Sequence, residues 1–396
     1  MESPHLYRKN APSDLDPAVV ERAIQLSQAQ EAAGVAPILS LNHLAVQANA
    51  PLKVLERIAA RAVDAYHIHE IRKRDRVSKR MIAAPTPELR QVQRWLLDNV
   101  FARVPVSPYA FAYVEGRSAP QCARRHVGAT WLVKLDVKDF FHEFDEAQVF
   151  SVLRSVQYSA LVSLEISRIV TRHVSTPQAW LPKKYASTSP RRPMPDAELV
   201  PDLFDHADDA PEYLSHPQGV RLGYLPQGSP SSGAISNILS RQLDEELAAL
   251  ASARGLTFTR YADDITLSSG EIFNRGRAEK ILHEATAILH RNRLTPNRRK
   301  SRIVTPGLPL EVVGVRVDGD ESRLPRRLRD RIEFHLRGIE QFGFAAHSRH
   351  VGFDDVLGFS NFLYGLIRYA HDVQPSLAAA YFARADAHFP AAQVGS

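Results

Sequence analysis

Two stretches of the chain place carboxylates inside runs that otherwise favour buried β-strands. Asp136 follows the apolar run TWLVKL, and Asp263 and Asp264 interrupt the alternating run LTFTRYADDITL. Apolar and β-branched residues predict a strand over 130–137 and a hairpin over 256–267, with the acidic pair near its turn. A carboxylate in such a run is costly unless a partner compensates its charge. These three aspartates are therefore the first candidates for function.

A divalent cation is the usual remedy for adjacent carboxylates that gain nothing structurally from each other. Oxygen ligands suit Mg²⁺, which keeps some of its waters and shares substrate phosphates. If the two strands are neighbours, Asp136 and Asp263 face one site that holds two ions, and such a pair clamps both the attacking and leaving oxygens of a phosphoryl transfer. The alternative reading of Asp136 is a helix N-cap, but Asp145 is better placed for that role.

Between these stretches lies the block LPQGSPSSGAISNILS, residues 225–240. Its prolines and glycines predict a tight loop ahead of a helix that starts near Ala234. A backbone rich in glycine and small hydroxyls lets a flat base pair approach closely, with Gln227 positioned to contact it. The alternative is a simple connection between a strand and a helix.

The rest of the chain predicts mostly helices around a small sheet, so the fold class is α+β. A hairpin is expected over 303–319. Residues 171–220 are rich in proline, and the part from 193 to 220 contains acidic residues but no Lys or Arg. This composition predicts an inserted loop. Helical periodicity covers the remaining stretches, 15–66, 87–101, 277–292 and 324–389.

Charge and cysteine content narrow the class of protein. The 396 residues hold 50 Lys and Arg against 44 Asp and Glu. Basic residues cluster at 72–80, 291–302 and 323–331, which are either solvated faces or a track for a polyanion. The single Cys122 excludes a disulfide framework and a cysteine-based zinc cluster, and fits a reducing cytoplasm. Without a signal peptide or an apolar run of spanning length, we expect a soluble cytoplasmic protein.

In their order and spacing, these motifs resemble those of reverse transcriptases, and more closely those of bacterial retron reverse transcriptases. Asp136 matches the first metal-binding aspartate, LPQGSPSS the PQG loop and YADD the catalytic box. CARRH at 122–126 stands where retron enzymes carry NAxxH, with Cys122 in place of asparagine. VVG at 312–314 stands at the VTG position, with Val313 in place of threonine.

The resemblance implies a role for further residues. The catalytic and metal-binding residues are Asp136, Asp263 and Asp264, which hold two Mg²⁺ ions. Substrate binding is expected at Lys73, Arg80, Phe141, Gln227, Gly228 and Lys300. In this set Lys73 and Arg80 balance the triphosphate, Phe141 is the gate that clashes with a ribose 2′-OH, and Lys300 lies near the leaving pyrophosphate. RNA contacts are expected at His126, Arg326 and Arg327.

The implied architecture is a right-hand polymerase. Residues 1–66 form a helical N-terminal region, 67–320 the fingers and a palm of antiparallel sheet plus helices, and 321–396 a helical thumb. The region 67–320 includes the proline-rich acidic insert at 171–220.

The implied function is RNA-directed DNA synthesis within a retron anti-phage system. The enzyme would copy a cognate structured noncoding RNA into branched RNA–DNA (msDNA) from dNTPs, and a separate effector protein would be its partner, without any membrane. Two alternatives remain open. One is another bacterial defence-associated or intron-type reverse transcriptase that is primed differently. The other is a non-catalytic RNA-binding scaffold.

Overall fold

The computed structural model describes residues 15–72, 79–173 and 222–389, together with residues 8 and 12. The proline-rich insert predicted at 171–220 therefore falls outside the described residues from 174 onward. The chain forms two compact units. The first comprises Met1–Val114, Val137–Glu245 and Leu289–Thr295, and the second Glu115–Asp136, Glu246–Ile288 and Pro296–Ser396.

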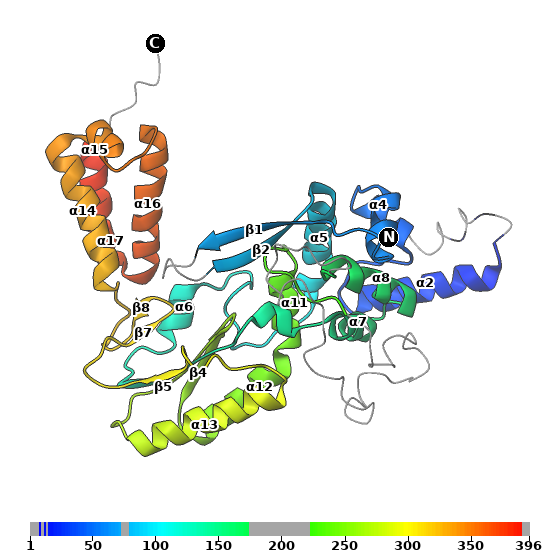
Figure 1. The fold of residues 1–396 in the computed structure, drawn as a ribbon, viewed down its shortest axis with the longest axis horizontal. Coiled ribbons are helices and arrows are strands. Elements are labelled where there is room, and N and C mark those ends of the chain that lie inside the picture. The colour runs from blue at the N-terminus through cyan, green and yellow to red at the C-terminus, as the bar shows by residue number, and fades with distance from the viewer. Residues whose placement is uncertain (1–7, 9–11, 13–14, 73–78, 174–221, 390–396) are drawn as a thin grey trace, which may run out of the picture. The chain divides into compact units, whose positions relative to one another are not determined.

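The described part of the first unit is mainly helical and includes a two-stranded ribbon (Figure 1). Its helices are α2 (Pro17–Ala32), α3 (Leu41–Gln47), α4 (Leu52–Ala59), α5 (Pro87–Asn99), α7 (Glu146–Ser155), α8 (Ala160–Val170) and α11 (Ser232–Leu239), with the short turns η1 (Phe101–Arg103) and η2 (Phe140–Glu143). Strands β1 (Tyr66–Arg72) and β2 (Lys79–Pro85) pair in antiparallel fashion. Helix α8 packs against α4, α5 and α7.

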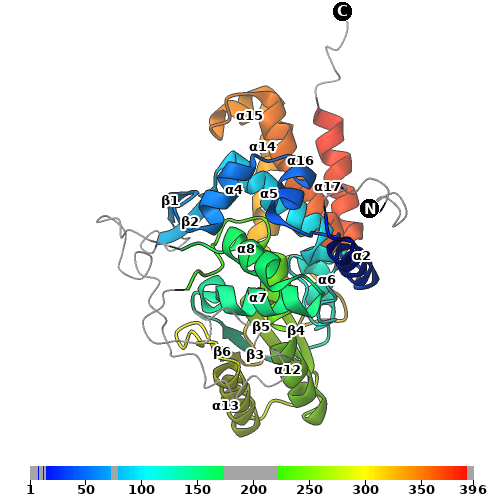
Figure 2. The same cartoon turned by 90° about the vertical axis from the view of Figure 1, so that its right-hand side faces the viewer.

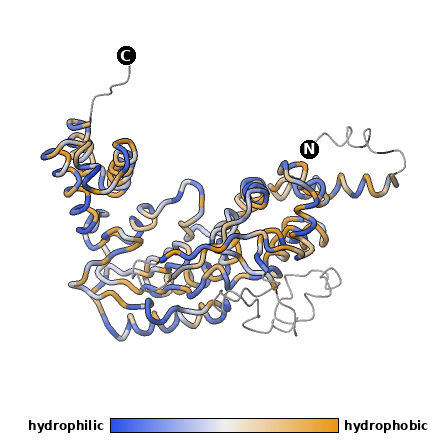
Figure 3. Tube along the Cα trace, turned by 45° about the horizontal axis from the view of Figure 1, so that its top comes forward, coloured by the Kyte–Doolittle hydropathy of each residue, from blue (hydrophilic) through white to orange (hydrophobic). Residues whose placement is uncertain are grey.

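Local sequence explains where these helices begin. Asp145 caps α7 in a capping box with Gln148, as expected for this aspartate. Ser159 caps α8 by accepting the Val162 backbone N–H on its hydroxyl, and Pro87 opens α5 in the first turn. Hydrophobic and hydrophilic segments are interspersed along the chain (Figure 3), and α5 buries one face through Leu89, Val92 and Leu96, whereas α11 is buried at six consecutive positions.

The second unit contains a four-stranded antiparallel sheet in the order β4-β5-β3-β6. Its strands are β3 (Trp131–Asp136), β4 (Thr257–Tyr261), β5 (Asp264–Ser269) and β6 (Arg302–Val304). The strand predicted at 130–137 and the hairpin predicted at 256–267 are both confirmed. Helix α13 (Arg275–Arg291) lies along one face of the sheet (Figures 1 and 2). The rings of Trp131 in β3 and Phe273, just before α13, make an edge contact.

One sequence prediction needs correction in this unit. The stretch 303–319 was expected to form a single hairpin, but Ile303 and Val304 belong to β6 and pair with β3. The hairpin is shorter and consists of β7 (Glu311–Val312) and β8 (Val315–Arg316). Sequence periodicity could not separate the two, because both halves are short and apolar.

The second unit also holds the short helix α6 (Ala119–Arg124) and a bundle of four helices near the C-terminal end. The bundle consists of α14 (Arg326–Phe342), α15 (Phe344–His350), α16 (Val356–Val373) and α17 (Pro375–His388). Helix α14 packs against the other three, and α16 packs against α17. Helix α12 (Arg241–Ala253) crosses the boundary between the units. No helix among the described residues is both long and apolar enough to cross a membrane.

Candidate active site

The candidate site lies at one end of the four-stranded sheet, where two carboxylates face each other. Asp136 is the last residue of β3 and Asp264 the first of β5, and the antiparallel register pairs them directly. Directly paired residues project from the same face of a sheet, and like charges there are destabilising. Asp136 is only 6% exposed. The chain therefore keeps two close carboxylates where packing alone would not favour them.

The third carboxylate belongs to the turn between β4 and β5. Tyr261 pairs with Asp264, so Ala262 and Asp263 form a two-residue connection. Ala262 has a φ of 56°, in the left-handed region that favours glycine or asparagine, and it is buried. Backbone strain of this kind persists where the surrounding structure enforces it, often beside functional groups.

The electrostatics of this end of the sheet favour a cation. Burial, together with the negative charges of Asp264 and Asp136, raises the pKa of Asp263 to about 6. Burial also raises the pKa of Asp264, although the positive charge of Lys134 opposes that shift. A raised pKa means that ionisation of the carboxyl group is unfavourable in this environment. A bound cation would stabilise the ionised form and offset that cost.

Asp136 is held by the loop that precedes β6. Lys300 Nζ donates to Asp136 Oδ1 at 2.6 Å, and Asn297 Nδ2 donates to Oδ2 at 2.9 Å. The Asn297 backbone N–H also donates to the Asp136 carbonyl at 2.7 Å. Asp136 is thereby fixed in direction by three bonds from one short loop.

The donor set suits Mg²⁺, because aspartate oxygens gather around one end of the sheet. In the described residues, however, no three His, Cys, Asp or Glu side chains converge closely enough to enclose an ion by themselves. Mg²⁺ shared with substrate phosphates needs only one or two carboxylates, so the arrangement fits such an ion rather than a closed structural metal centre.

Lys134 is the residue of this site that sequence reasoning missed. It lies two positions before Asp136, so both side chains project from the same face of β3. Its ammonium interacts electrostatically with Asp264, and burial lowers the pKa of Lys134. The two-residue spacing was a usable signal, since alternate residues of a strand share a face.

His126 was predicted to contact RNA, and the structure places it inside the second unit. It is 1% exposed, and its two ring nitrogens lie 2.7 Å from Ser268 Oγ and 2.7 Å from Thr259 Oγ1. Ser268 is in β5 and Thr259 in β4. In this arrangement His126 ties together the two strands that carry the acidic turn and leaves no ring nitrogen for RNA, so the structure contradicts the predicted RNA contact and makes His126 an interior structural residue.

The PQG loop lies in the first unit against β2. The Ala83 backbone N–H donates to the Gln227 carbonyl at 2.7 Å. Gly228 has a φ of 121°, and a Cβ there would stand 2.7 Å from the Ala83 carbonyl oxygen. The glycine is required by this close approach of two backbone segments, a reason that differs from the base-pair approach expected from the sequence.

Of the other residues predicted to bind substrate or RNA, one lies in a cluster of aromatic rings, two are exposed and two cannot be described. Phe141, in η2, contacts the rings of Phe140 and Tyr113 at centroid distances of 5.5 and 6.0 Å. Arg326 and Arg327 open α14 and are largely exposed, with side-chain exposures of 84% and 65%. Lys73 lies outside the described residues. The side chain of Arg80, a β2 residue, is outside them as well.

Comparison with known proteins shows similarity to one protein family and to several of its members. Residues 218–318 match the reverse transcriptase (RNA-dependent DNA polymerase) family. The retron Mx162 reverse transcriptase of Myxococcus xanthus is 30% identical over 78% of this chain and 58% of its own length. The retron Mx65 reverse transcriptase of the same organism is 32% identical over 60% of this chain and 48% of its own length. The chain thus spans about half the length of these two relatives.

Two further matches are more distant, one in sequence and one in structure. The retron Ec86 reverse transcriptase of Escherichia coli is 25% identical over 66% of each chain. Among solved structures, a telomerase of Candida albicans aligns with 94% of this chain and 61% of its own, at 13% identity and a TM-score of 0.37.

Proposed function

The chain belongs to the reverse transcriptase (RNA-dependent DNA polymerase) family and is related to the retron reverse transcriptases, and from that premise we propose that it polymerises DNA on an RNA template. The observation that carries the proposal is the pairing of Asp136 with Asp264 across β3 and β5, with Asp263 in the adjoining turn. A primer hydroxyl attacks the α-phosphorus of a dNTP, and the bond to pyrophosphate breaks.

Asp136, Asp263 and Asp264 are the proposed ligands of two Mg²⁺ ions, which when bound supply positive charge to the triphosphate and to the attacking oxygen. Asn297 orients the Asp136 carboxylate through its amide. Lys300 is 54% exposed at its side chain, so its ammonium can also reach a phosphate, which fits a role beside the leaving pyrophosphate. Positioning of this kind supplies much of the rate in phosphoryl transfer.

Residues of the first unit are the proposed contacts of the nucleotide. Lys73 and Arg80 balance the triphosphate charge, Phe141 excludes a ribose 2′-OH, and Gln227 with Gly228 lies against the template–nucleotide pair. We propose the right-hand division accordingly, with fingers and palm over 67–320 and a thumb over 321–396. The exposed guanidinium groups of Arg326 and Arg327 suit backbone contacts to an RNA–DNA hybrid.

The retron relatives suggest the template and the biological setting. We propose a cognate structured noncoding RNA as template, priming from a 2′-OH of that RNA, and a branched RNA–DNA product. In this proposal the complex acts in the cytoplasm in phage defence and restrains a separate effector protein.

The test is the nucleic acid that copurifies when the gene is expressed with its flanking DNA. After RNase and then debranching enzyme, the remaining strand is sequenced. A single short DNA, joined to RNA by a 2′-5′ linkage, is the expected result. Unbranched or heterogeneous DNA would keep the polymerase but assign it to differently primed enzymes. RNA without DNA would favour the non-catalytic scaffold.

A further inference from the structure

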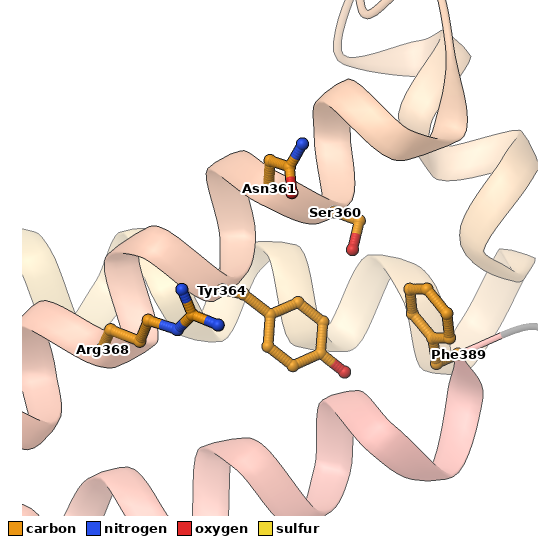
Figure 4. A pocket seen from close by; sticks show the side chains of 5 residues that line it. All are labelled: Ser360, Asn361, Tyr364, Arg368 and Phe389. Atoms are coloured by element: carbon orange, nitrogen blue, oxygen red, sulfur yellow. The ribbon is translucent and has the colours of Figure 1, made fainter.

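The helical bundle of the second unit contains a small pocket away from the carboxylates. It has a volume of about 270 Å³ and is lined by Ser360, Asn361, Tyr364, Arg368 and Phe389 (Figure 4). Four of these residues come from α16, and their spacing puts them along one side of that helix, while Phe389 follows the end of α17.

Three of the polar side chains of this pocket have no partner in the described part of the fold. Within the described part of the chain, the side chains of Ser360, Asn361 and Arg368 have no hydrogen bond or ion pair. By contrast, Arg384 on α17 pairs with both Glu333 and Glu340. A hydroxyl, an amide and a guanidinium thus converge on one hollow with their bonding capacity available to a ligand.

Two aromatic rings complete the lining. The Tyr364 and Phe389 rings are 6.0 Å apart at centroids and nearly perpendicular, at 82°. Phe389 is 40% exposed, so it offers ring surface to a planar ligand. The Tyr364 hydroxyl donates to Asp386, and burial with that bond raises the pKa of Tyr364 to about 12, so the ring remains neutral.

We propose that this pocket binds one nucleotide. Its base packs against Tyr364 and Phe389, Asn361 bonds the polar edge of the base, and Arg368 binds the phosphate. The Asp386 carboxylate accepts a hydrogen bond from the Tyr364 hydroxyl and does not pair with Arg368. The Arg368 guanidinium is therefore available to the phosphate. The volume lies near the lower limit of roughly 300 Å³ for ligand pockets, which suits a single nucleotide and excludes a duplex. The proposal rests on the proposed function for one point, that an RNA strand supplies the nucleotide.

The test measures binding of fluorescein-labelled oligouridylate, oligoadenylate, oligocytidylate and oligoguanylate to the full chain by fluorescence anisotropy, without dNTPs or divalent cations. The variants are Asn361→Ala, Arg368→Ala and Tyr364→Phe, each checked for folding by circular dichroism. Arg349→Ala is the matched control, because Arg349 is an exposed arginine of the same bundle that does not line the pocket.

We expect Arg368→Ala to weaken binding about fivefold or more, and Asn361→Ala to change the ranking of the four oligonucleotides. Tyr364→Phe keeps the ring and should bind as wild type, and Arg349→Ala should stay within about twofold, as expected for one screened surface charge. Equal losses in Arg368→Ala and Arg349→Ala, or an unchanged ranking in Asn361→Ala, would overturn the proposal.

Competition with free UMP or AMP separates the sources of the nucleotide. Displacement of the oligonucleotide by the free nucleotide would identify a small-molecule ligand, whereas binding that only a strand achieves would identify RNA. Binding is measured without polymerisation, so a chain that fails to synthesise DNA can still pass this test. A chain that synthesises DNA can equally fail it.

Discussion

At the scale of residues, the site keeps features that cost stability. Asp136 and Asp264 face each other across two strands, and Ala262 holds a left-handed backbone beside Asp263. Natural sequences keep such local conflicts where function needs them and compensate for them elsewhere. Here the compensation comes from Lys300 and Asn297 on Asp136, and from Lys134 near Asp264.

Asp263→Asn should stabilise the protein when divalent cations are absent. The pKa of Asp263 is raised to about 6, so ionisation costs folding free energy above that pH, and the cost disappears below the ordinary aspartate pKa of about 4. The variant should therefore gain about 1–3 kcal/mol at pH 8 and nearly nothing at pH 4. Urea denaturation in EDTA at both pH values measures this, and an equal gain at both would contradict the shift.

Phe141→Ala should admit ribonucleotides. Its ring packs on Phe140 and Tyr113, and its removal would open space at the position proposed for the sugar 2′ carbon. The ratio of dNTP to rNTP incorporation, measured with single nucleotides, should fall by at least about tenfold, which is the scale of a pocket contact. Phe140→Leu is the neighbouring control, and unchanged discrimination in Phe141→Ala would mean that the gate is elsewhere.

At the scale of elements, the short hairpin β7–β8 contains Val313, the residue that stands in place of the threonine of the VTG motif. Val313 and Gly314 form its turn with φ values of 49° and 80°, the two positive values of a type I′ turn. A β-branched residue is a genuine outlier there, since its Cβ crowds the backbone. Asparagine followed by glycine is the sequence that such a turn favours.

Val313→Asn should accordingly raise stability by about 1 kcal/mol. Val315→Asn is the control, because Val315 is fully buried in β8 and a polar side chain there should destabilise the protein. Thermal denaturation of both variants checks the pair. A destabilised Val313→Asn would show that the valine side chain contributes packing that outweighs the strain.

The residues that flank 174–221 form an isolated antiparallel bridge. Arg172 and Tyr224 exchange both backbone hydrogen bonds, at 2.8 and 3.1 Å, so the chain on either side of 174–221 is closed at its base. The Arg172 side chain is 2% exposed and pairs with Asp64 at 2.7 Å. Since loop-closure entropy changes slowly with length, the base should form with a shorter connection.

Replacing residues 175–220 with a short Gly/Ser linker should leave the melting temperature within about 5 °C of the original. Adding Asp64→Ala to the shortened chain should destabilise it by about 3–5 kcal/mol, because Arg172 then becomes a buried unpaired charge. Calorimetry of the two proteins measures both effects. A shortened chain that does not fold would show that the insert is part of the core.

Sequence periodicity predicted β3, the β4–β5 hairpin and the positions of the three aspartates well, because strands with alternating residues leave a local signal. It could not predict that Asp136 pairs with Asp264 rather than with Asp263, since register depends on the fold of both strands. The bonds from Asn297 and Lys300 to Asp136 join residues more than 160 positions apart, which no local pattern reports.

At the scale of the whole molecule, the sheet and its carboxylates belong to the second unit, together with the loop that holds Asp136. The first unit carries the PQG loop against β2 and the ring cluster around Phe141. We propose that the residues of the second unit carry the chemistry and that those of the first unit contact the nucleotide.

The most direct test of the central claim is Mg²⁺-dependent incorporation of labelled dNTPs on a primed RNA template. Wild type is compared with Asp136→Asn, Asp263→Ala and Asp264→Ala, and with Glu279→Gln as a control acid that is exposed on α13 and paired only with Arg275 among the described residues. We predict incorporation by wild type and the control, and a loss of at least about a hundredfold in Asp136→Asn and Asp263→Ala. Equal incorporation by all of these proteins would contradict the catalytic assignment.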